Sequence, residues 1–117
     1  MQSQRQLEGS IQFQELARGF QNARVHVVVE DVSRADAPSA VVARHSLEGV
    51  SAEPGPAPVL RFSMPIEGLE PRRSYSVSVH VDVDGDGSVS MGDYITTESY
   101  PVTRESSRIT VTVRPVA

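Results

Sequence analysis

Hydrophobic and polar side chains alternate along several short stretches of this chain, the pattern expected of β-strands with one buried face. The clearest stretches are residues 75–83, where every second residue from Tyr75 is apolar, and residues 109–113, where isoleucine and valine alternate with threonine. The same alternation predicts strands at residues 25–29 and 60–64. Weaker versions of the pattern lie at residues 11–14, 41–47 and 94–97.

Turn-forming residues separate these stretches, among them Gly55, Pro56, Pro71 and Pro101. Residues 16–21 hint at a helix but are too few to predict one. No long helical pattern lies between the strands, as parallel crossovers would require, so the pattern predicts an all-β fold, an antiparallel β-sandwich of about seven short strands. We expect a single domain over residues 1–117, with residues 1–8 as a disordered N-terminal segment and residues 52–58 as a linker-like stretch.

Composition narrows the classes of function. The net charge of −4 and the scattered arginines argue against nucleic acid as a partner, because phosphate binding relies on clustered basic residues. No stretch approaches the roughly 18 apolar residues of a membrane helix, and residues 1–6 lack the apolar core of a signal peptide. The absence of cysteine excludes disulfides, thiolate zinc sites and a lipid-modified cysteine. The sequence as it stands predicts a cytoplasmic protein, or a periplasmic or secreted one if an N-terminal signal has been removed.

An aspartate-rich segment at residues 82–93, Asp-Val-Asp-Gly-Asp-Gly-Ser-Val-Ser-Met-Gly-Asp, matches most positions of the twelve-residue calcium loop. Carboxylates stand at positions 1, 3 and 5, and Gly87 at position 6 permits the sharp turn. Calcium takes six to eight oxygen ligands at about 2.3 to 2.6 Å. The spacing predicts Ca²⁺ as the bound ion, with ligands from Asp82, Asp84, Asp86, Ser88, Ser90 and Asp93.

Two features of the segment depart from the usual calcium loop. Position 12 is Asp93 in place of the longer glutamate, which is similar to the loops of dockerin modules, and the segment leads into a predicted strand where a helix usually follows. The alternative is a solvated acidic hairpin turn. Four carboxylates within about 5 Å would repel by on the order of 3 kcal/mol per pair at an effective dielectric of about 20, which favours the ion. We expect it to order the loop between two strands. Its affinity would be that of an extracellular module, which conflicts with a cytoplasmic location.

No catalytic arrangement stands out. The serines show no nucleophile-elbow spacing, and no glycine-rich phosphate loop precedes a helix, so we expect no enzymatic activity. His26 and His80 fall on the polar phase of their strands, which indicates surface histidines, and His45 is expected at an edge or rim.

A resemblance to a known family lies in residues 30–39, Glu-Asp-Val-Ser-Arg-Ala-Asp-Ala-Pro-Ser, together with residues 41–43, 75–83 and 99–102. Over most of its length from about Leu7, the chain resembles the YbaY/YscW-type family of small bacterial β-sandwich proteins, which includes type III secretion lipoprotein chaperones, or pilotins. The resemblance implies an immunoglobulin-like or transthyretin-like sandwich, a lipid anchor, and escort of a secretin subunit to the outer membrane. From the residues alone, positions 30–39 indicate a structural corner, with Asp31 or Asp36 as alternative ligands of an ion.

Two functions follow from these observations. The first is a non-enzymatic, calcium-stabilised module that binds another protein through a sheet edge or an exposed face, in an oligomeric state that the sequence does not give. The second is an envelope chaperone or pilotin-like protein with its export signal missing. Carbohydrate binding is a third alternative, but tryptophan is absent and aromatic residues are only 5% of the chain, so few platforms for stacking sugars exist.

Overall fold

The computed structural model describes residues 6–14, 16, 18–34, 36–54, 59–66 and 68–116. Within these residues it contains strands and no helix, which confirms the all-β prediction; β2 already begins at Phe20, inside the stretch that hinted at a helix. The strands are β1 (Gln6–Phe13), β2 (Phe20–Asp31), β3 (Ala40–Ala52), β4 (Val59–Pro65), β5 (Tyr75–Asp82), β6 (Tyr94–Thr96), β7 (Pro101–Val102) and β8 (Arg108–Pro115).

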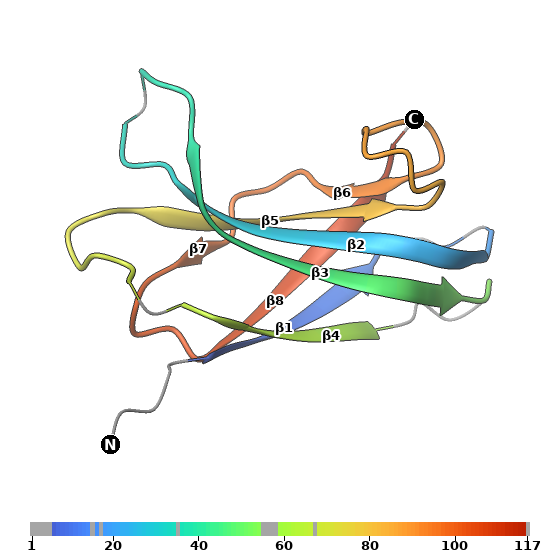
Figure 1. Cartoon of the computed structure of the whole chain (residues 1–117), viewed down its shortest axis with the longest axis horizontal. Helices are drawn as coiled ribbons and strands as arrows, with labels where there is room; N and C mark the ends of the chain where they lie inside the picture. Colours follow the sequence, from blue (N-terminus) through green and yellow to red (C-terminus); the bar gives the residue numbers. More distant parts are fainter. Residues whose placement is uncertain are drawn as a thin grey trace.

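The strands form one continuous sheet, not the two separate sheets that were predicted. Its order is β3-β2-β5-β6-β8-β1-β4, with β7 paired to β5, and it curls into a nearly closed, barrel-like shape (Figure 1). The short strand β6 joins what would otherwise be two layers, because it pairs with both β5 and β8. Strands β1 and β8 run parallel, so the sheet is not purely antiparallel either.

The core fills the concave side of this sheet. Valines alternate on β2 and β5 and lie opposite one another in register, as in the pairs Val25 with Val81 and Val27 with Val79. Phe13, Phe20 and Tyr94 close one end of the core, with ring centroids of Phe13 and Tyr94 5.0 Å apart and nearly perpendicular. Burial of this alternating apolar face is the main force that sets the register, because a slip by one residue would turn the face to solvent.

The sheet begins earlier in the chain than expected. Residues 6–8, predicted to be disordered, belong to β1, where Leu7 is fully buried and pairs with Met64. Residues 1–5 lie outside the described residues. So do residues 55–58 of the predicted linker, whereas Ala52 still belongs to β3. The described residues contain no helix that could cross a membrane.

The two ends of the sheet are β3 and β4. β3 pairs with β2 alone among the described strands, and none of its thirteen residues is fully buried. The edges approach one another around His45 of β3 and Phe62 of β4, whose ring centroids are 6.5 Å apart. His45 therefore lies on an edge strand, as predicted.

Candidate functional site

The acidic loop connects β5 to β6 and lies beside the C-terminal end of the described chain (Figure 1). It begins after Asp82, the last residue of β5, and ends at Asp93, directly before β6. The main-chain N–H of Val116 donates to the carbonyl oxygen of Asp93 at 2.9 Å, which ties the end of the loop to the chain after β8. Both bounding aspartates are buried, with 0% and 1% of their surface exposed.

The Asp82 carboxylate organises the first half of the loop. Its Oδ1 accepts a hydrogen bond from the N–H of Gly85 at 3.0 Å, and its Oδ2 accepts one from the N–H of Gly87 at 2.8 Å. Gly87 has a φ of 81°, a left-handed conformation that glycine adopts without steric cost. The strand pattern placed Asp82 on the solvent-facing phase, but the loop folds back over it.

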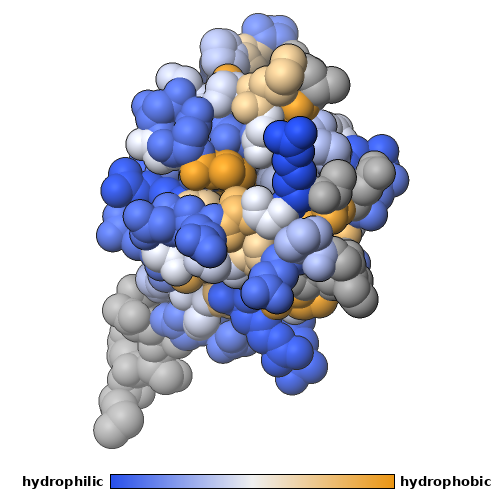
Figure 2. All heavy atoms as spheres, turned by 90° about the vertical axis from the view of Figure 1, so that its right-hand side faces the viewer, coloured by the Kyte–Doolittle hydropathy of each residue, from blue (hydrophilic) through white to orange (hydrophobic). Residues whose placement is uncertain are grey.

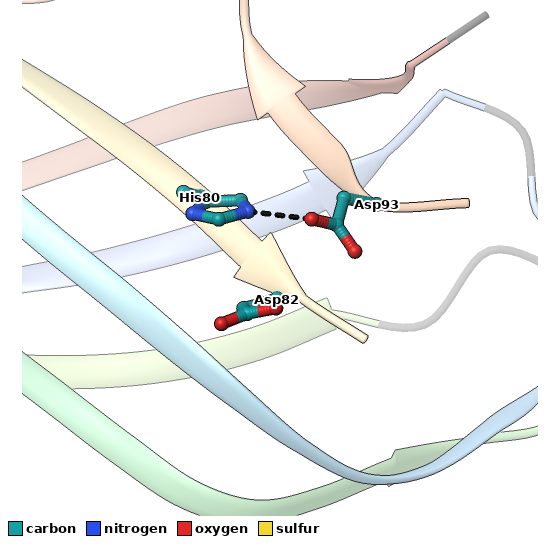
Figure 3. A group of neighbouring side chains, drawn as sticks. All are labelled: His80, Asp82 and Asp93. Carbon is teal, nitrogen blue, oxygen red and sulfur yellow. Dashed lines mark hydrogen bonds and ion pairs between the residues drawn. The ribbon is translucent and has the colours of Figure 1, made fainter. Parts of the chain in front are cut away.

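The Asp93 carboxylate organises the second half. Its Oδ1 accepts from the N–H of Val83 at 2.9 Å, and its Oδ2 accepts from the N–H of Ser90 at 3.2 Å. The same Oδ2 lies 2.8 Å from Nε2 of His80 on β5 (Figure 3). At both ends of the loop, a buried carboxylate thus accepts hydrogen bonds from main-chain N–H groups, in the place of a main-chain carbonyl oxygen.

The remaining predicted ligands lie on the exposed side of the loop. Asp86 Oδ1 accepts from the N–H of Ser88 at 2.9 Å, and the Ser90 hydroxyl donates to Asp84 Oδ2 at 3.2 Å. A side-chain hydrogen bond with Asp82 is the largest of the causes that hold the pKa of Asp84 below its usual value; partial burial opposes it, and bonds from Asp86 and Ser90 add to it.

Four of the six predicted calcium ligands come together. One carboxylate oxygen from each of Asp82, Asp84, Asp86 and Asp93 lies within 4.8 Å of the others. Among the described residues, no arginine forms an ion pair with any of these four carboxylates; the side chains that approach the two buried ones are His26, 3.6 Å from Asp82, and His80, 2.8 Å from Asp93. The Ser90 hydroxyl joins the group through Asp84, whereas for Ser88 the structure shows only its backbone N–H bound to Asp86.

Residues 30–39 form a corner and do not join this site. Asp31 accepts from the N–H of Ser33 at 2.9 Å and from Arg73 at 2.8 Å. The Ser33 hydroxyl in turn accepts from the N–H of Ser74 at 2.9 Å, directly before β5. Among the described residues, neither Asp31 nor Asp36 belongs to a group of side chains that could share an ion. The corner therefore fastens the end of β2 to the start of β5.

The sequence interpretation missed the role of two histidines. His26 and His80 were expected to be ordinary surface residues; the His80 side chain is only 16% exposed, and the His26 side chain is 32% exposed with its Nε2 buried. The rings lie opposite one another on β2 and β5, 5.5 Å apart. The available signal was the spacing of His80 and Asp82, which places both on one face of a strand.

The surface around the loop contains both hydrophobic and hydrophilic side chains (Figure 2). At the end of the molecule that Figure 2 shows, small separate hydrophobic patches lie among hydrophilic side chains. Val89 and Met91 of the loop are 55% and 80% exposed. A shallow, mostly apolar hollow of about 260 Å³ lies beside the histidines, lined by His26, Val28, Ser78, Val79, His80, Val89, Ile95 and Thr96.

Comparison with known proteins gives two matches and one negative result. The family described as "Type III secretion system lipoprotein chaperone (YscW)" matches residues 2–113. The fold is similar to the structure of an alternative pilotin from the type II secretion system of Vibrio cholerae, with 25% sequence identity and a TM-score of 0.71, over 98% of this chain and 99% of the pilotin chain. None of the curated proteins matches the sequence.

Proposed function

Because this chain belongs to the family of type III secretion system lipoprotein chaperones (YscW), we propose that it is a non-enzymatic chaperone of the bacterial envelope that binds a secretin subunit. The observation that carries the proposal is the family match over residues 2–113. The likeness to a pilotin along nearly the whole of both chains supports it. Of the two functions that the sequence left open, these findings favour the chaperone over the calcium-dependent assembly module.

The free edge of β3 is the surface that best suits such a partner. An edge strand presents unpaired main-chain N–H and C=O groups, to which an extended peptide can add as a further strand. Val41 and Val42 on β3 are 39% and 49% exposed, and Leu47 covers the core only in part. An extended segment paired with β3 would bury these side chains and form hydrogen bonds with the unpaired main-chain groups of the edge.

The direct test is binding of the purified chain to a purified secretin subunit from the same bacterium, measured by calorimetry and by co-elution in size-exclusion chromatography. We expect a one-to-one complex per secretin subunit, because one extended segment fills the edge of β3. Absence of any complex with the folded chain would contradict the chaperone function.

We also propose that the acidic loop holds a calcium ion with a structural role. The support is the convergence of four carboxylates, two of them buried, with no arginine paired to them among the described residues. Buried carboxylates are costly unless charge or hydrogen bonds compensate them, and a divalent cation would add positive charge to the hydrogen bonds that the loop donates. Calcium is favoured over magnesium because the loop supplies many oxygens, while magnesium prefers to keep several waters.

A further inference from the structure

A second donor set lies beneath the acidic loop, on the outer face of the sheet. We call it the histidine–aspartate cluster; it consists of His26 on β2, His80 and Asp82 on β5, and Asp93 before β6. His26 and His80 are direct partners in the β2–β5 register, and their rings lie at 30° to one another. His80 and Asp82 are two residues apart and so share one face of β5. Figure 3 shows His80, Asp82 and Asp93 gathered at the point where β5 ends.

The distances in this cluster suit metal ligands. One ligand atom from each of His80, Asp82 and Asp93 lies within 4.8 Å of the other two. His26 lies outside this group of three, and its Nε2 is 3.6 Å from Oδ2 of Asp82. That separation is too long for a hydrogen bond. Two ligands bound tetrahedrally at about 2.0 to 2.1 Å from one zinc ion stand about 3.3 Å apart, so a small closure of this gap would produce a ligand pair.

His26 Nε2 provides an independent observation. This atom is buried, although the His26 side chain as a whole is 32% exposed, and it has no hydrogen-bond partner among the described residues. A buried polar atom without a partner is unfavourable and rare in folded proteins. The atom faces a carboxylate that is itself fully buried. A cation placed between the two would give Nε2 of His26 a partner and balance the charge of the Asp82 carboxylate.

From these observations we propose that the histidine–aspartate cluster binds a divalent transition metal, with zinc as the best fit. His80, Asp82 and Asp93 supply one imidazole nitrogen and two carboxylate oxygens, and the imidazole of His26, once it closes the gap to Asp82, would complete the four-coordinate set typical of zinc. Calcium takes oxygen ligands and would not use the imidazoles. The shallow hollow beside both histidines gives the ion a route from solvent.

Binding requires each Nε2 to present a lone pair. In the tautomer that donates to Asp93, His80 carries a proton on Nε2, which moves to Nδ1 when the metal replaces the hydrogen bond. If the ring is protonated on both nitrogens, the Nε2 proton passes to solvent. The metal then occupies the place of the shared hydrogen, and its charge balances the Asp82 and Asp93 carboxylates.

The zinc site is independent of the chaperone function, but it shares Asp82 and Asp93 with the proposed calcium site. The two ions would therefore compete. The exposed oxygens of Asp84 and Asp86 belong only to the calcium set, and the two imidazoles belong only to the zinc set. Variants of each group separate the two proposals.

The test uses the whole chain after removal of metal by a chelator. Zinc is titrated by calorimetry, and cobalt(II) is added as a probe whose visible absorption reports tetrahedral nitrogen and oxygen ligands. We expect one zinc per chain, and a dissociation constant raised by about tenfold or more in His26→Ala and His80→Ala, since loss of even a second-shell partner costs about 10- to 100-fold. His45→Ala, on the edge strand β3, is the matched control, and Asp86→Ala should retain zinc.

Circular dichroism shows whether each variant folds. If His80→Ala does not fold, His26→Ala carries the test, because Nε2 of His26 makes no hydrogen bond that the substitution would remove. The proposal is overturned if the folded wild-type chain takes up no zinc. It is also overturned if His26→Ala binds zinc as tightly as the wild type, or if Asp86→Ala weakens zinc as much as the histidine variants do; either result would assign the metal to the acidic loop.

Discussion

Gly9 of β1 lies directly opposite Phe62 of β4, and the Phe62 ring covers the place where a side chain of Gly9 would stand. A Cβ added at Gly9 would lie 2.0 Å from Cζ of Phe62. Phe62 is 4% exposed and belongs to the core cluster, so the ring has little room to move. The absence of a side chain at position 9 is thus a condition for the burial of this ring near the edge of the sheet.

Gly9→Ala is therefore expected to destabilise the protein. Forcing an extra methyl group into a packed core costs about 1 to 3 kcal/mol, which urea unfolding would detect as a lower midpoint with an unchanged slope. Gln12→Ala, at an exposed position of the same strand, is the control and should change little. If the two variants unfold at the same urea concentration, the Phe62 ring does not need Gly9.

Calcium is expected to raise the thermal stability of the chain. A ligand at about a hundredfold its dissociation constant stabilises the folded state by about 2.7 kcal/mol. The melting temperature should be higher in excess calcium than in chelator, and the difference should shrink in Asp84→Ala because that substitution removes one carboxylate of the converging group.

Asp36→Asn provides the control for charge alone, because Asp36 lies outside both candidate ion groups. It should keep the full calcium-dependent difference. Equal melting temperatures with calcium and with chelator in the wild type would remove the calcium proposal, whatever the outcome for zinc.

The corner at residues 30–39 predicts a pH dependence of stability. Hydrogen bonds from Ser33 are the largest cause that lowers the pKa of Asp31 from its ordinary 3.8, with Arg73 as a further cause. A carboxyl group whose pKa is lower in the folded state stabilises the fold above the unfolded pKa, and this contribution is lost as the pH falls through the folded value. Asp31→Asn should lower the urea midpoint at neutral pH, and the difference from the wild type should vanish in strong acid. A difference that is the same at every pH would show that the charge of Asp31 plays no part.

Most strands could be predicted from the sequence, but their arrangement could not. Alternation of apolar residues is a local property, and it located β2, β4, β5 and β8 because each buries one face. The three residues of β6 lie within the weaker pattern predicted at residues 94–97, whereas β7 contains two residues, too few to show a period. The continuity of the sheet depends on β6, and the parallel pair of β1 and β8 joins opposite ends of the chain. Neither relationship can be recognised from the spacing of apolar residues along the chain.

The loop of the candidate site could be predicted from the sequence, but the side chains around the loop could not. The spacing of the aspartates brought four of six predicted ligands together, because the glycines let the chain turn where the pattern requires it. The histidines were assigned to the surface because the period alone was considered. His26 meets His80 through the β2–β5 register, and Asp93 at the end of the loop then contacts His80; the first contact depends on residues distant in the sequence and the second on how the loop folds.

Val42→Asp tests where the secretin subunit binds. Val42 is 49% exposed on β3, and a charged side chain on an edge strand opposes the addition of another strand. Val59 of β4 is also 49% exposed, on the other edge strand, so Val59→Asp is a matched control for the introduced charge. Calorimetry should show a dissociation constant about tenfold higher for Val42→Asp, equivalent to about 1.4 kcal/mol, and an unchanged one for Val59→Asp. If only Val59→Asp weakens the complex, the partner adds to β4; if neither does, it binds away from both edges.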